Sequence, residues 1–89
     1  MGARFNLLIR MHKTLSQLEV GDTARVVGYQ ADSDYSARLM RLGLIPGTEL
    51  KLQRRAPLGD PIQIRFRGYS LALRPAEAGD LLLEALDRA

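Results

Sequence analysis

The chain has 89 residues, of which 46% are hydrophobic and 26% charged, and its formal net charge at pH 7 is +3. This length holds one compact domain with a small core, which excludes the doubly wound sheets and β/α barrels that many enzymes use. The absence of cysteine excludes disulfide frameworks, thiolate metal sites and cysteine nucleophiles. The basic balance permits an acidic partner but does not require one, because +3 is an ordinary charge for a small domain.

We expect no secretion signal at the amino terminus. The apolar run from Leu7 to Ile9 is too short for a signal peptide, and no run approaches the roughly 18 apolar residues of a membrane span. We expect residues 1–12 to form a flexible extension, with His12 exposed in it, and residues 13–89 to form the single domain of a soluble protein.

Alternation of apolar and polar residues predicts that most of the domain consists of short antiparallel strands. After a short turn at residues 14–18, strands are expected at residues 23–30, 50–53, 62–67, 71–73 and 81–86, with a further turn at 75–79. The last strand is more apolar and is expected to be buried on both faces. Because an open sheet would leave both edges bare, this pattern favours a mainly β fold, a five-stranded SH3-like or OB-like barrel.

One segment breaks the alternation and predicts a helix from residue 33 to residue 42. Tyr35, Leu39 and Leu42 recur at helical spacing, which places Leu39 and Leu42 in the core. Ser33 or Asp32 can cap the amino end of this helix, and Gly43 supplies the left-handed residue that ends it.

The residues that enzymes and metal sites need are sparse. The chain has no phosphate-binding glycine loop, and a single histidine excludes a catalytic triad and a histidine zinc cage. Asp32 and Asp34 fit helix capping better than metal ligation, and His12 is at most an adventitious metal contact. The sequence therefore predicts a non-enzymatic protein with no resident cofactor and at most weak transition-metal binding.

Basic residues fall on outward positions of neighbouring predicted strands and could form one positive face. Single-strand nucleic-acid binders interleave such bases with aromatic side chains, whereas here Phe66 points inward and Tyr69 lies at a turn. The pattern favours a solvated or protein-facing surface over a nucleic-acid site. The basic residues concerned are Lys51, Arg54, Arg55, Arg65, Arg67 and Arg74.

Three segments together resemble the FeoA family, the small cytoplasmic component of bacterial ferrous-iron uptake. They are Arg38-Leu39-Met40-Arg41-Leu42-Gly43-Leu44-Ile45-Pro46-Gly47-Thr48, Ala56-Pro57-Leu58-Gly59-Asp60-Pro61-Ile62 and Leu71-Ala72-Leu73-Arg74. The likeness extends from about Leu15 to Leu86. It implies an SH3-like barrel with a helix inserted after the first strand. It also implies a cytoplasmic accessory role in ferrous-iron transport. The protein would be recruited to the inner face of the membrane by docking on FeoB, the permease with a GTPase domain, and would modulate the assembly or activity of FeoB.

Two loops of these segments carry apolar residues beside turns. Pro46 and Gly47 suit the centre of a type II turn, and Pro57 to Pro61 set a loop between strands, so structure alone accounts for much of both loops. Exposed apolar residues such as those expected at Leu44, Ile45 and Leu58 can anchor a partner. The hypothetical docking surface comprises Arg38, Arg41, Leu44, Ile45, Pro46, Pro57, Leu58, Gly59, Asp60 and Pro61.

Two other functions are alternatives to docking. Iron-dependent repressors of the diphtheria-toxin repressor family carry a similar barrel, but one helix of about ten residues leaves no room for a recognition helix. A weak transition-metal-binding sensor or carrier is the alternative reading, and it would need clustered carboxylates that the sequence does not show.

Overall fold

The computed structural model describes residues 12–86 of the chain. The predicted flexible extension, residues 1–12, lies outside these residues apart from His12. No helix within residues 12–86 has the length and apolar character that crossing a bilayer requires.

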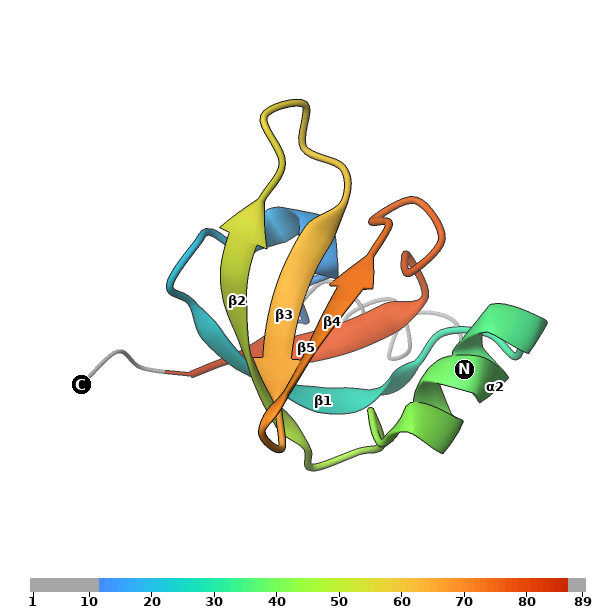
Figure 1. The fold of residues 1–89 in the computed structure, drawn as a ribbon. Helices are drawn as coiled ribbons and strands as arrows, with labels where there is room; N and C mark the ends of the chain where they lie inside the picture. The colour runs from blue at the N-terminus through green and yellow to red at the C-terminus, as the bar shows by residue number, and fades with distance from the viewer. Residues whose placement is uncertain (1–11, 87–89) are drawn as a thin grey trace.

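Five antiparallel strands form one sheet in the order β4-β3-β2-β1-β5. The strands are β1 (Thr23–Tyr29), β2 (Glu49–Arg55), β3 (Ile62–Phe66), β4 (Tyr69–Leu73) and β5 (Leu81–Ala85). β1 pairs with β2 only over Thr23–Arg25 but with β5 from Ala24 to Tyr29, with a bulge between Val26 and Gly28. The sheet therefore bends at β1, so that β1 and β5 cross behind β2, β3 and β4 and the sheet curls into a small barrel (Figure 1).

The core lies between these two parts of the curled sheet. The predicted alternation is confirmed in β3 and in β2 up to residue 53, where every second side chain is buried and its neighbours are partly or fully exposed. Each large apolar side chain removed from water stabilises the fold by about 1.5 to 3 kcal/mol. The fully buried large side chains are Leu15, Leu18, Val26, Leu44, Leu52, Ile62, Ile64, Leu81 and Leu83.

The prediction that the last strand is buried on both faces was wrong. Leu81 and Leu83 are buried, but Leu82 between them is only half-buried and Glu84 is exposed. β5 belongs to a single curled sheet, so, like β2 and β3, it packs only its inner face on the core. An apolar run alone did not distinguish a strand with one buried face from a strand buried on both faces.

The predicted helix is confirmed as α2 (Asp34–Leu42), inserted between β1 and β2. The Ser36 amide donates to the Ser33 Oγ at 3.0 Å, so Ser33 is the amino-terminal cap, and Gly43 ends the helix with φ 113°. Ser36 and Leu39 are buried. The short turn before β1 is also confirmed, as the 3-10 helix η1 (Leu15–Gln17).

Candidate interaction surface

The loop between α2 and β2 is held firmly by hydrogen bonds on both sides. The Thr48 amide donates to the Ile45 carbonyl at 3.0 Å and Gly47 has φ 94°, which confirms the predicted type II turn. The Gly47 amide donates to the Val26 carbonyl, and the Val26 amide donates to the Thr48 carbonyl, both at 2.8 Å. The loop is therefore an extension of the β1 edge with fixed geometry.

Leu44 was expected at the surface of this loop, and that expectation was wrong because the side chain is 0% exposed. The amides of Leu44 and Gly43 donate at 3.0 Å to the carbonyls of Leu39 and Met40, which is the Schellman pattern of helix termination. This pattern turns the residue after the glycine back toward the last turn of the helix, and here Leu44 joins Leu39 in the core. Of the two apolar residues, only Ile45 remains substantially exposed.

The loop between β2 and β3 carries the most exposed large apolar side chain of the described residues, Leu58, which is 96% exposed. The Gly59 amide donates to the Ala56 carbonyl at 2.7 Å, and the Ala56 amide donates to the Pro61 carbonyl at 3.1 Å. These bonds close the loop on itself and leave the Leu58 side chain at its tip. Among the described residues nothing covers this side chain, as the sequence predicted.

The two loops do not lie next to each other. β2 runs directly from the Ile45 loop to the Leu58 loop, and a strand of its length spans about 20 Å at roughly 3.3 Å per residue. Figure 1 shows the two loops at opposite ends of the barrel. The residues of the hypothetical docking surface therefore do not form one patch: Ile45 and Pro46 lie at one end of the barrel and residues 57–61 at the other.

Arg38 and Arg41 lie on exposed positions of α2 and face a groove between this helix and β4. Leu42 also lines the groove and is 49% exposed, so its predicted place in the core was wrong. Leu42 is the last residue of α2, and its side chain lies beside β4, whereas Leu39 one turn earlier reaches the barrel interior. Arg38 and Arg41 therefore lie beside the groove and not beside the Leu58 loop.

The predicted basic face is confirmed only in part. Lys51 and Arg65 are directly opposite each other on β2 and β3, and both are exposed, as is Arg54. Arg55 is instead half-buried, and its guanidinium donates to the carbonyl of Leu18, the residue that directly follows η1. The bulge between Leu52 and Arg54 allows this by shifting the register of the strand.

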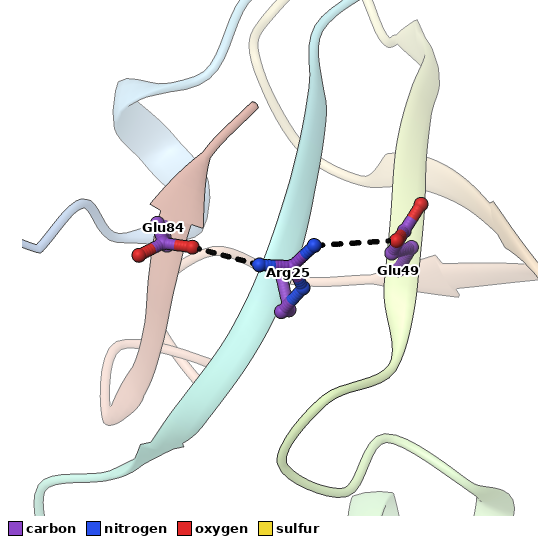
Figure 2. A network of polar contacts seen from close by, with 3 residues as sticks. All are labelled: Arg25, Glu49 and Glu84. Atoms are coloured by element: carbon purple, nitrogen blue, oxygen red, sulfur yellow. Dashed lines mark hydrogen bonds and ion pairs between the residues drawn. The ribbon is translucent and has the colours of Figure 1, made fainter. Parts of the chain in front are cut away.

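The ion pairs between described residues both belong to Arg25, in the centre of the outer face of β1. Its guanidinium nitrogens lie 3.0 Å from Glu84 on β5 and 3.5 Å from Glu49 on β2, so that one side chain ties three strands (Figure 2). The register places Glu84 and Glu49 directly opposite Arg25 on either side. All three side chains are substantially exposed, which makes this cluster a surface feature of the sheet.

The described residues contain no group of three or more His, Cys, Asp or Glu side chains arranged to hold a metal ion. Asp32 and Asp34 flank the Ser33 cap, in agreement with a capping role for this segment. His12 is half-buried and not exposed as predicted, and its buried Nδ1 has no hydrogen-bond partner within residues 12–86.

Sequence reasoning missed the groove between α2 and β4. Its residues come from elements that are separated by β2 and β3 in the chain, so no local spacing reveals it. Two local signals bear on the elements beside the groove. The residue pair Arg67-Gly68 between alternating apolar runs is typical of a tight hairpin, which places β4 next to β3. The Schellman pattern at a helix-ending glycine indicates that the residue after the glycine, here Leu44, is buried.

Comparison with known proteins agrees with this architecture. The solution structure of an FeoA-like protein from Clostridium acetobutylicum superposes with a TM-score of 0.80 and 38% identity, covering 89% of this chain and 92% of that one. The zinc complex of FeoA from Stenotrophomonas maltophilia, described as a prokaryotic SH3 domain protein, superposes with a TM-score of 0.74 and 28% identity, covering 86% of this chain and 99% of that one.

A curated relative of this chain is a fusion of Fe(2+) transport protein A with the Fe(2+) transporter FeoB from Porphyromonas gingivalis. It is 29% identical over 72 residues, which cover 81% of this chain. This chain spans only 8% of the length of that relative.

The fold and its surface loops define a small SH3-like barrel with one helix inserted after the first strand. Residues 13–85 match the FeoA domain. The chain therefore belongs to the FeoA domain family, which is linked to ferrous-iron transport.

Proposed function

We propose that this protein is a non-enzymatic cytoplasmic accessory component of ferrous-iron transport, which docks on a FeoB-like permease and modulates its assembly or activity. The observation that carries the proposal is the relative in which the FeoA and FeoB portions form one chain. Fusion holds two domains at a high effective concentration without strong affinity between them. Where an FeoA domain is not fused to its partner, it needs a binding surface to reach that partner.

The exposed side chains supply two such surfaces at opposite ends of the barrel. Leu58 at the tip of its loop is an apolar anchor, framed by Pro57, Gly59, Asp60 and Pro61. Ile45 and Pro46 lie at the other end, next to the helix that carries Arg38 and Arg41. Apolar anchors surrounded by polar or charged residues are typical of protein-binding sites.

Modulation of the permease requires more than docking. A partner that binds two states of a protein with equal affinity does not change the equilibrium between them. If this protein regulates the GTPase domain, its affinity for the permease must differ between the nucleotide-bound and nucleotide-free states. If it acts in assembly alone, its affinity is the same in both.

The test is binding of the full chain to the matching full-length permease in detergent or nanodiscs, with and without a GTP analogue. We expect saturable binding that Leu58→Asp weakens at least about tenfold, because a carboxylate replaces an apolar anchor in the contact. Val20→Asp is the matched control, since Val20 is another exposed apolar residue, 55% exposed, in the turn before β1. Absence of binding to the permease in either nucleotide state contradicts the proposal.

A further inference from the structure

A groove runs between α2 and the outer edge of β4. It consists of two hollows of about 220 and 350 Å³ that share Leu42 and Leu71 and are therefore continuous. β4 contributes residues from both of its faces, Leu71 and Leu73 from the core side and Ser70 and Ala72 from the outer side. The groove therefore follows the edge of the strand, and we call it the β4 groove.

The peptide groups of β4 alternate between its partner β3 and the β4 groove. Arg67 and Gly68 have φ values of 51° and 82° and join Phe66 to Tyr69 in a two-residue hairpin. In such a hairpin the residues that flank the turn exchange both hydrogen bonds, and every second pair along the ladder does the same. The N–H and C=O groups of Ser70 and Ala72 consequently point away from β3.

These groups have no backbone partner within residues 12–86. β4 is the last strand in the sheet order, and no backbone group of another described segment bonds to its outer edge, although the Tyr35 side chain of α2 contacts the backbone of Arg74 just beyond the strand. The opposite edge of the sheet is treated differently, because Lys13 bonds to Leu83 of β5 through both its amide and its carbonyl, each at 2.8 Å. β4 thus presents a row of available backbone donors and acceptors, the arrangement that accepts an additional strand.

The side chains along the groove define what such a strand must look like. Arg38 and Arg41 from α2 and Arg74 at the end of β4 line it, with Glu77 as its only acidic lining residue among those described. None of the three arginines forms an ion pair with a described carboxylate. Leu42 and Tyr69, 49% and 68% exposed, add apolar surface.

We propose that the β4 groove binds an extended peptide segment of another protein, with apolar side chains at alternate positions and carboxylates between them, which adds a strand to β4. Its backbone bonds to the peptide groups of Ser70 and Ala72. Its apolar side chains cover Leu42 and Tyr69, and its carboxylates pair with the arginines. We assign this peptide segment to the cytoplasmic part of the permease, and in that assignment the inference rests on the proposed function.

A second copy of this chain fits the groove less well. Pairing β4 with β4 of another molecule brings two sets of Arg38, Arg41 and Arg74 to the same interface, and like charges in contact oppose association. An acidic segment from a different protein removes this repulsion. The charge of the groove is therefore the feature that separates the two occupants.

The first test uses a short synthetic peptide in which valine and glutamate alternate, titrated into the full chain and followed by backbone amide chemical shifts. We expect saturable shifts at the amides of Ser70 and Ala72 and along α2, and none from a peptide in which valine and lysine alternate. Equal shifts with both peptides, or shifts confined to residues outside the groove, overturn the proposal.

Variants separate the backbone and charge contributions. Ala72→Pro removes one outward N–H without removing a bond to β3, and we expect it to weaken the peptide at least about tenfold. Arg38→Glu should weaken peptide binding to a similar extent. Because Arg38 is an exposed residue of α2, this substitution does not alter β4 itself. Arg54→Glu is the matched control, because it changes the net charge by the same amount as Arg38→Glu, at an exposed position of β2 away from the groove. If Arg54→Glu weakens the peptide as much as Arg38→Glu, the attraction is non-specific and the proposal fails.

Failure of this inference can be told apart from failure of the proposed function. If the permease binds the wild-type chain and binds Ala72→Pro and Arg38→Glu equally well, docking stands and the groove is not its site. If the valine-glutamate peptide binds the groove but the permease does not bind at all, the groove proposal stands without the permease as its source. A concentration-dependent dimer that Ala72→Pro dissociates would identify a second copy as the occupant and overturn the proposal.

Discussion

At the scale of single residues, Tyr29 joins the barrel to the end of α2. Its hydroxyl donates a hydrogen bond of 2.7 Å to the carbonyl of Leu44, whose side chain is in the core. Burial raises the pKa of the Tyr29 phenol to about 12 from its ordinary value near 10. The neutral phenol is therefore the form that the folded state favours, because only it can donate this hydrogen bond.

This arrangement predicts that the difference in stability between the wild-type protein and Tyr29→Phe depends on pH. At pH 7 Tyr29→Phe should lower the free energy of unfolding by about 1 kcal/mol, the usual net value of a hydrogen bond. The folded pKa lies above the unfolded one, so the stability that Tyr29 contributes is fully present below pH 10 and is lost between about pH 10 and 12. Urea unfolding of both proteins at pH 7 and above pH 10 checks this. A difference that stays constant over this range contradicts the assigned bond.

At the scale of elements, α2 shows what local sequence can and cannot predict. Its cap at Ser33 and its end at Gly43 were predicted correctly because both depend on residues within one turn of the helix. The exposure of Leu42 was not, because it depends on where β4 lies beside the helix. The strands were predicted with near-correct bounds for the same local reason. The β4 groove could not be, because sheet order decides which edge stays open.

Gly43 carries the most direct prediction at this scale. Alanine at φ 113° is strained, although its Cβ would meet Phe66 at an ordinary 3.5 Å. We expect Gly43→Ala to lower the free energy of unfolding by about 1 to 2 kcal/mol through backbone strain alone. Gly43→Asn should lose less, because asparagine tolerates the left-handed region better. Chemical denaturation of the two variants distinguishes strain from crowding, since crowding would make the larger asparagine the worse substitution.

At the scale of the whole molecule, Arg25 links both parts of the curled sheet. It bonds to Glu84 on β5 and Glu49 on β2 from the strand at which the sheet bends. Side-chain exposures of 43% for Arg25, 53% for Glu84 and 63% for Glu49 leave these pairs open to solvent and ions. Their contribution to stability is therefore small, and the buried side chains between the two parts of the sheet dominate.

We accordingly expect Arg25→Ala to lower the free energy of unfolding by only about 0.5 to 1 kcal/mol at low ionic strength, and by less in concentrated salt, which screens exposed charges. Arg54→Ala is the control, because Arg54 is exposed and forms no ion pair with a described residue. Thermal or urea unfolding at two salt concentrations measures both. A loss of several kcal/mol that salt does not reduce would show that Arg25 does more than pair with the two glutamates.

The pairing of β1 with β5 also governs when the barrel can form during synthesis. Arg25 and Glu84 are 59 residues apart in sequence, and β5 is the last of the five described strands to leave the ribosome. Until then, one edge of β1 and the apolar side chains beneath it have no partner. Pairing of such distant segments slows folding relative to local structure. The nascent chain is therefore most open to misassociation just before its last strand arrives, and loss of residues 81–86 would make that state permanent.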